Sequence, residues 1–213
     1  LEAVLVETEA KGFKVQWVRS DNEPAMVTSA MAQLLSAHGT STDRSAPGQH
    51  APRVERRIQF VKEKHRSLMA HVPYKMSMLL VWHSVLAANR FTNMQQASSS
   101  VSPLTPREKF LGYQVDYDRD IGHAFGTYVQ ATGPNTDNTD RPRTEAYIYL
   151  YPTGVLGHAK CLKISGHKVV VRTNVTCLPI TDALIDHLNE QAVRDCCDIS
   201  LLVSESCIIT IIL

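Results

Sequence analysis

The chain has 213 residues, of which 44% are hydrophobic and 20% are charged, and its formal net charge is +1 at pH 7. This is the composition of a soluble globular protein with room for one ordinary domain or two small ones. A net charge so close to zero is not a nucleic-acid-binding signature, so any basic surface must be local.

The cysteines and the two ends of the chain indicate in which cellular compartment the protein is expected. The five cysteines contain no Cys-x-x-Cys pair, and no His/Cys spacing fits a zinc site. These cysteines lead us to expect a reducing compartment. No charged-then-apolar leader begins at Leu1, so we expect a nuclear or cytoplasmic protein rather than a secreted one. The start at Leu1 resembles a cut from a longer polyprotein. The apolar run at 208–213 is too short to span a bilayer, so no membrane partner is expected.

The first half of the sequence predicts mainly helices. Residues 13–19 (FKVQWVR) are the exception, because they alternate apolar and polar side chains as a strand does. A loop rich in Ser, Thr, Pro and Gly spans 39–52, with room for a short strand near Thr40. Helical spacing of apolar residues predicts helices at 1–12, from Pro24 to about His38, at 54–69 and, far more apolar, at 74–91.

The second half predicts a small all-β structure after a polar, Ser-rich connector at 95–103. Turn signals at 152–154 (PTG) and 165–167 (SGH) separate β-rich segments. We therefore expect strands at 125–132, 144–151, 159–165 and 168–180. Short strands with close turns suggest a small barrel or sandwich. The tail at 181–213 is expected to be irregular or foreign to the fold.

Two carboxylates are candidates for metal chemistry. Asp21 follows the strand at 13–19, where α/β folds place ligands, although an Asx turn or a helix cap is the simpler explanation. Glu55 lies in the first turn of the helix at 54–69, where the helix dipole alone stabilises a carboxylate. Together they would hold Mg²⁺ or Mn²⁺ for phosphoryl transfer. Two ions normally need a third carboxylate, and this chain has none in a plausible position.

A basic stripe accompanies Glu55. Gln59, Lys62 and Arg66 follow it at +4, +7 and +11, on the same side of the helix, and Arg56 is adjacent. Residues 53–66 contain six Lys or Arg against two Glu. Such a run is either a solvated face or a helix that lies along a phosphate backbone, and the sequence leaves both open.

Five segments resemble, in order, the integrase of Copia-type retrotransposons. WVRSDNEPA (17–25) resembles the strand that carries the second acid of the Asp-Asp-Glu triad, and PGQHAPRVERRIQFVKEKHRSL (47–68) resembles the segment that carries the third. VPYKMSMLLVWHSVLAANRFTNM (72–94) looks like the next buried helix. TPREKFLGYQVD (105–116) resembles the Thr-Pro-x-Glu-x-(Trp/Phe)-x-Gly motif, and VVVRTNVTCLPI (169–180) resembles the last strand of the SH3-like barrel.

The resemblance implies an α/β fold and an activity. It implies a partial RNase H-like integrase catalytic core at 1–94, mostly helical, a linker and motif segment at 95–124, an SH3-like β-barrel at 125–180 and the tail at 181–213. Asp21 and Glu55 would be catalytic acids that bind Mg²⁺ or Mn²⁺. The intact parent would join element ends to target DNA as a homo-oligomer, with DNA contacts from Arg56, Gln59, Lys62 and Arg66.

This chain departs from the family pattern upstream of its first strand. The first catalytic Asp of the family, and three strands with it, would precede Leu1. We therefore expect the chain to be inactive as it stands and its N-terminal half to be poorly stable, because three lost strands forfeit much apolar burial. A non-catalytic nucleic-acid-binding module or a decayed remnant needs no triad, and both remain alternatives.

Overall fold

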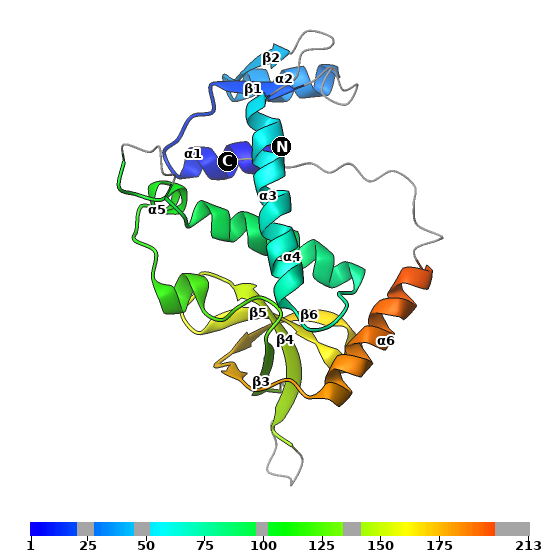
Figure 1. Ribbon diagram of the computed structural model, residues 1–213. Coiled ribbons are helices and arrows are strands. Elements are labelled where there is room, and N and C mark those ends of the chain that lie inside the picture. Colours follow the sequence, from blue (N-terminus) through cyan, green and yellow to red (C-terminus); the bar gives the residue numbers. More distant parts are fainter. Residues whose placement is uncertain (21–27, 45–51, 97–101, 134–141, 199–213) are drawn as a thin grey trace. The chain divides into compact units, whose positions relative to one another are not determined.

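The computed structural model describes residues 1–20, 28–44, 52–96, 102–133 and 142–198 (Figure 1). The described residues form a mixed α/β protein that divides into two compact units, Leu1–Gln59 and Phe60–Leu213. The boundary between the units falls within one long helix. No helix among the described residues combines the length and the apolar composition that a membrane crossing requires.

The first unit contains a two-stranded parallel sheet. Among the described residues of this unit, the buried apolar side chains are Leu5 and Leu35, one from each of its first two helices. Because parallel neighbours need a crossover between them, the second helix connects the two strands. The strand predicted at 13–19 is shorter than expected, since its partner offers only four residues, and the short strand near Thr40 is confirmed. The elements are α1 (Glu2–Ala10), β1 (Trp17–Ser20), α2 (Ser29–Ala37) and β2 (Ser41–Arg44).

Two long helices, α3 (Pro52–His71) and α4 (Met78–Asn93), occupy the middle of the chain. Ser77 caps α4, because its Oγ accepts a hydrogen bond from the Leu80 N–H at 3.4 Å. The helix predicted at 74–91 therefore begins four residues later than expected, at Met78. Tyr74 lies outside it and donates its hydroxyl to the Gly126 carbonyl at 2.8 Å, which ties this turn to the sheet.

The segment predicted as a linker contains two short helices, α5 (Pro106–Leu111) and η2 (Tyr117–Ile121), the latter a single π-helical turn. A capping box begins α5: the Thr105 hydroxyl accepts from the Glu108 N–H at 3.2 Å, and the Glu108 carboxylate accepts from the Thr105 N–H at 2.8 Å. Gly112 ends the helix with a φ of 75°, which favours glycine. Residues 102–124 are therefore structured rather than a plain connector.

Five antiparallel strands form a sheet in the order β6-β5-β4-β3-β7. The strand predicted at 168–180 divides at Asn174, whose φ is 51°, and its second half pairs with β3 at the opposite edge. The two edge strands do not pair with each other among the described residues, so the sheet is open where the sequence predicted a barrel. It contains β3 (Tyr128–Thr132), β4 (Thr144–Pro152), β5 (His158–Lys163), β6 (Lys168–Thr173) and β7 (Thr176–Cys177), with η3 (Ile164–Gly166) between β5 and β6.

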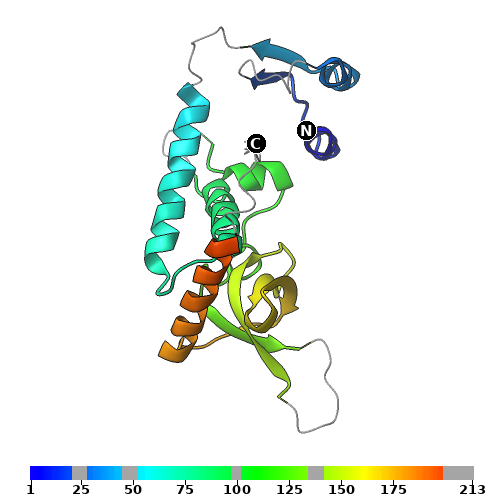
Figure 2. The same ribbon diagram turned by 90° about the vertical axis from the view of Figure 1, so that its right-hand side faces the viewer.

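Alternating side chains give this sheet two buried faces. In β4, Tyr147 and Tyr149 point to one face and Ile148 and Leu150 to the other, as the strand period of two requires. The first face holds a cluster whose buried residues all come from β3, β4 and β5. The second packs against α4 and the C-terminal helix, so these helices and the sheet share one core (Figures 1 and 2).

The C-terminal helix is α6 (Asp182–Asp198), so the expectation of an irregular tail is wrong for these residues. Its apolar side chains recur at helical spacing and pack on the sheet core, with Leu188 and Ala192 buried. The Asn189 side chain accepts from the Lys75 N–H at 2.7 Å, which joins α6 to the turn that precedes α4. The residues at 199–213 lie outside the described part of the chain.

Candidate nucleic-acid interface

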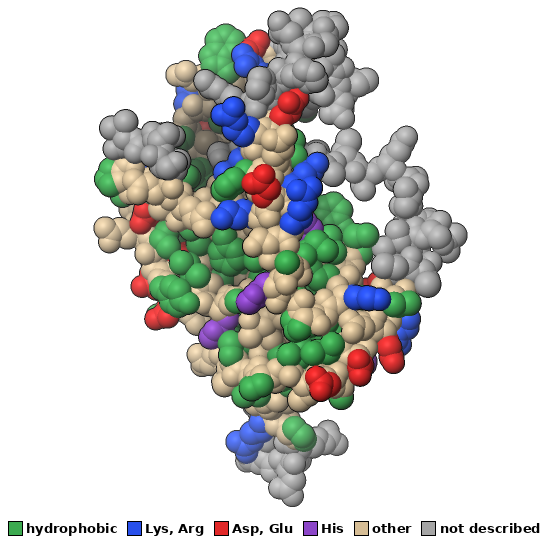
Figure 3. All heavy atoms as spheres, in the orientation of Figure 1, with side chains coloured by type: hydrophobic (Ala, Val, Ile, Leu, Met, Phe, Trp, Pro, Cys, Tyr) green, Lys and Arg blue, Asp and Glu red, His purple; other side chains and the backbone are tan. Residues whose placement is uncertain are grey.

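The basic stripe predicted from the sequence lies on α3. Glu55, Gln59, Lys62 and Arg66 are all exposed, and Arg56 beside them is exposed as well. In Figure 3, Lys and Arg side chains gather along the N-terminal part of α3, with acidic side chains among them. The helix therefore presents cations to solvent, interrupted by carboxylates.

Other side chains of α3 contact the core of the second unit. Leu68 packs against the core shared by α4 and the sheet. His65 Nδ1 lies 2.7 Å from the hydroxyl of buried Ser84 on α4, and that hydroxyl donates to the Val81 carbonyl at 2.7 Å. Because the serine proton is used on Val81, His65 must donate from Nδ1. Burial, and then the charge of Arg66, hold the pKa of His65 below its usual value.

The two predicted catalytic acids are not brought together by the described residues. Asp21 follows β1 directly but lies outside the described part of the chain. Glu55 stands in the first turn of α3, where the helix dipole favours a carboxylate. Within the described ranges, no three His, Cys, Asp or Glu side chains gather closely enough to hold a metal ion.

A second charged cluster was not found from the sequence. Asp120 of η2 is fully buried, and Arg119 donates to its Oδ2 from Nε and Nη2 at 2.9 and 2.7 Å. Arg107 of α5 donates to Oδ1 at 3.2 Å, and Arg90 of α4 lies 3.8 Å from the same oxygen. Burial acts to raise the pKa of Asp120, but these hydrogen bonds and charges outweigh it and hold the pKa below its usual value. The cluster joins α4, α5 and η2.

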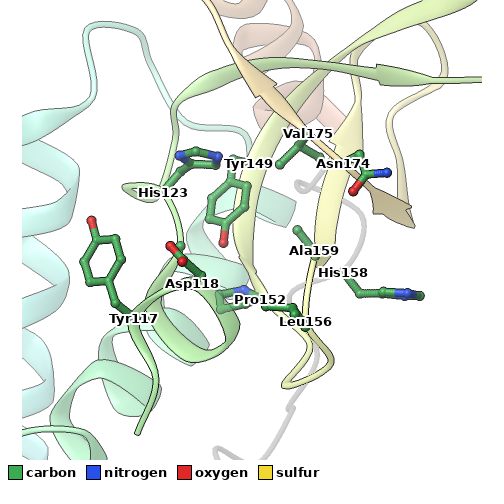
Figure 4. Close-up of a pocket in the computed structure, with 12 residues that line it drawn as sticks. Tyr117, Asp118, His123, Tyr149, Pro152, Leu156, His158, Ala159, Asn174 and Val175 are labelled. Carbon is green, nitrogen blue, oxygen red and sulfur yellow. The ribbon is translucent and has the colours of Figure 1, made fainter.

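A cavity of about 280 Å³ opens beside this cluster, next to β4 and β5. Figure 4 shows Asp118, His123 and Tyr149 on one side of it and His158 and Asn174 on the other. The His123 ring meets the Tyr149 ring edge-on, with 5.3 Å between centroids. Burial raises the pKa of Tyr149 to about 12, so its hydroxyl stays protonated at neutral pH. The sequence carried no signal for this cavity, because its lining comes from three separate segments.

No family model matches this sequence, and no curated protein matches it. One similar solved chain belongs to the cryo-EM structure of the simian T-cell lymphotropic virus intasome in complex with the PP2A regulatory subunit B56 gamma. It is 11% identical, with a TM-score of 0.36. The match covers 84% of this chain and 65% of that one, so this chain spans less than two thirds of its length. At this level of likeness, any functional argument rests on the residues of the chain itself.

Proposed function

We propose that this chain derives from a Copia-type retrotransposon integrase and that it binds DNA through the exposed face of α3. The ordered motifs between residues 14 and 180 support the ancestry. The observation that supports binding is the placement of Lys62 and Arg66, both exposed on a helix that contacts the rest of the second unit through the half-buried His65 and Leu68. On the same grounds we assign the first unit to part of an RNase H-like core and the five-stranded sheet to an SH3-like domain.

The spacing along α3 suits a phosphate backbone. Lys62 and Arg66 are four residues apart, which is about 6 Å along the helix axis, so both cations can reach one strand of DNA. Gln59, one turn before Lys62, adds a neutral donor, and Arg56 adds a further exposed cation. Lysine and arginine contacts to phosphate carry no sequence information, so the binding is expected to tolerate any sequence.

The intact parent would also carry metal chemistry. Carboxylate oxygens are the ligands that Mg²⁺ and Mn²⁺ prefer, and we assign Asp21 and Glu55 to that role in the parent. Two carboxylates are fewer than a two-ion site needs, so we derive no reaction for this chain alone. Element and target DNA, a homo-oligomeric assembly and a nuclear or cytoplasmic location belong to the same proposal.

The binding proposal is tested by the equilibrium affinity of the purified chain for a labelled DNA duplex at low salt. The double variant Lys62→Gln/Arg66→Gln is expected to bind at least tenfold more weakly. The matched control, Lys75→Gln/Lys109→Gln, removes the same charge from exposed positions outside α3 and is expected to bind as the unaltered chain does. If the unaltered chain binds no DNA at low salt, the binding proposal fails and an inert remnant remains.

The catalytic ancestry has a separate test. A version extended upstream to include the family's first catalytic Asp is expected to catalyse Mn²⁺-dependent strand transfer. Both Asp21→Asn and Glu55→Gln are expected to abolish it. Full activity in either variant would show that the metal assignment is wrong, whatever the DNA affinity of the stripe.

A further inference from the structure

The charged cluster around Asp120 contains more positive than negative charge. Three guanidinium groups, of Arg90, Arg107 and Arg119, surround this single buried carboxylate. The carboxylate is already used, because it accepts from Arg107, twice from Arg119, and from the Asp116 N–H at 3.1 Å. Three of these four hydrogen bonds end on Oδ2 and one on Oδ1. Asp120 is therefore well satisfied without a hydrogen bond from Arg90.

Arg90 is largely buried and has no hydrogen-bond partner among the described residues. Its side chain is 16% exposed, and its nearest carboxylate oxygen is 3.8 Å away, beyond hydrogen-bond distance. Both Nε and Nη2 are shielded from solvent, and no acceptor among the described residues reaches them. Arg107 Nε is in the same condition. Because a guanidinium cannot lose its proton in a protein, Arg90 stays charged, and buried donors without acceptors are rare in proteins.

The unused nitrogens of Arg90 form the edge that binds oxyanions. Nε and Nη2 point the same way, and Arg119 uses this same pair of atoms to bind Asp120. The equivalent pair on Arg90 has no hydrogen-bond acceptor among the described residues, although its Nη2 lies 3.8 Å from Asp120 Oδ1. A side chain whose role was only to hold Asp120 would instead approach it to hydrogen-bond distance, as Arg107 and Arg119 do.

We propose that Arg90 and Arg107 bind a phosphate-class oxyanion beside Asp120. A phosphate group offers several acceptor oxygens, fits the planar fork of a guanidinium and offsets the excess charge of the cluster. The group comes either from free phosphate or from the phosphate of a nucleic acid. This site is separate from the α3 stripe and does not depend on it. Because the binding edge is shielded, entry of the anion requires a local rearrangement, and binding is best measured at equilibrium.

The test uses inorganic phosphate and the full chain. Phosphate is expected to raise the melting temperature in a saturable way relative to chloride at the same ionic strength. Arg90→Met is expected to abolish this response, whereas Arg143→Met, which removes an exposed arginine outside the cluster, is expected to leave it unchanged. An equal response from the unaltered chain and Arg90→Met, or no response at all, would overturn the proposal.

A second variant and a competition experiment complete the test. Arg90→Lys keeps the charge but loses the planar fork, so phosphate affinity measured by ³¹P line broadening is expected to fall at least tenfold even if Arg90→Met does not fold. A 5′-phosphorylated oligonucleotide identifies the source: displacement of phosphate assigns the site to nucleic acid, and no displacement assigns it to the free ion. Lys62→Gln/Arg66→Gln is expected to keep the full phosphate response, which separates this site from the proposed DNA-binding stripe.

Discussion

Replacement of Asp120 by asparagine removes the buried carboxylate that forms ion pairs with arginines of α4, α5 and η2. The asparagine side chain would keep the shape but would leave three guanidinium groups around a neutral amide. Breaking a buried ion pair from one side costs about 3–5 kcal/mol, a large fraction of the usual 5–15 kcal/mol of unfolding free energy. With an m-value of about 2 kcal/mol/M, the urea midpoint of the second unit is expected to fall by about 2 M.

The assay is urea unfolding followed by far-UV circular dichroism. Asp118→Asn is the matched control, because Asp118 is two residues away, is exposed and lies outside the cluster. It is expected to change the unfolding free energy by less than about 0.5 kcal/mol. A loss below about 1 kcal/mol in Asp120→Asn would refute the view that this carboxylate holds the three segments together.

Three further predictions concern the packing of the second unit. Leu80→Ala is expected to cost about 2–5 kcal/mol in urea unfolding, because Leu80 is 2% exposed in the shared core, whereas Leu86→Ala at 53% exposure is expected to be nearly neutral. Thr105→Ala is expected to cost about 1 kcal/mol through loss of the capping box, and Thr105→Ser to restore most of it; equal thermal melts for the two variants would contradict this. The folded state lowers the pKa of His65, so its contribution to stability is present above the unfolded value near 6.5 and is lost as the pH falls through the folded value. The melting temperature is therefore expected to fall between pH 7 and pH 5, and His65→Asn to flatten that slope while His71→Asn leaves it unchanged.

Local patterns predicted much of this fold. The helical period around Val61 and Leu68 identified α3, and the turn residues at 152–154 and 165–167 separated the strands correctly. The main error in the sheet came from Asn174, because its left-handed backbone moves the last strand to the far edge. The sequence alone does not reveal that change of partner, since both halves of 168–180 have strand composition.

The two larger omissions have different causes. The residues of α6 were expected to be irregular or foreign to the fold, although Leu184, Leu188 and Ala192 recur at helical spacing. The cluster at Asp120 depends on Arg90, 30 positions earlier, and only the three-dimensional fold brings the two together. Long-range convergence of charges leaves no periodic signal in a sequence.

The candidate interface was predicted in part. The sequence placed Lys62 and Arg66 on one side of a helix, and the structure has both exposed on α3. It left open whether that face is merely solvated or binds phosphate, and exposure alone does not decide between the two. The pairing of Asp21 with Glu55 remains a prediction, because Asp21 lies outside the described residues.

The salt dependence of DNA binding tests the central proposal most directly. Each phosphate contact contributes about 0.9 to the slope of log affinity against log salt concentration. Lys62→Gln/Arg66→Gln is therefore expected to reduce the magnitude of that slope by about 1.8 relative to the unaltered chain, and Lys75→Gln/Lys109→Gln to leave it unchanged. Identical slopes for the unaltered chain and the α3 variant would contradict a phosphate-binding role for this helix.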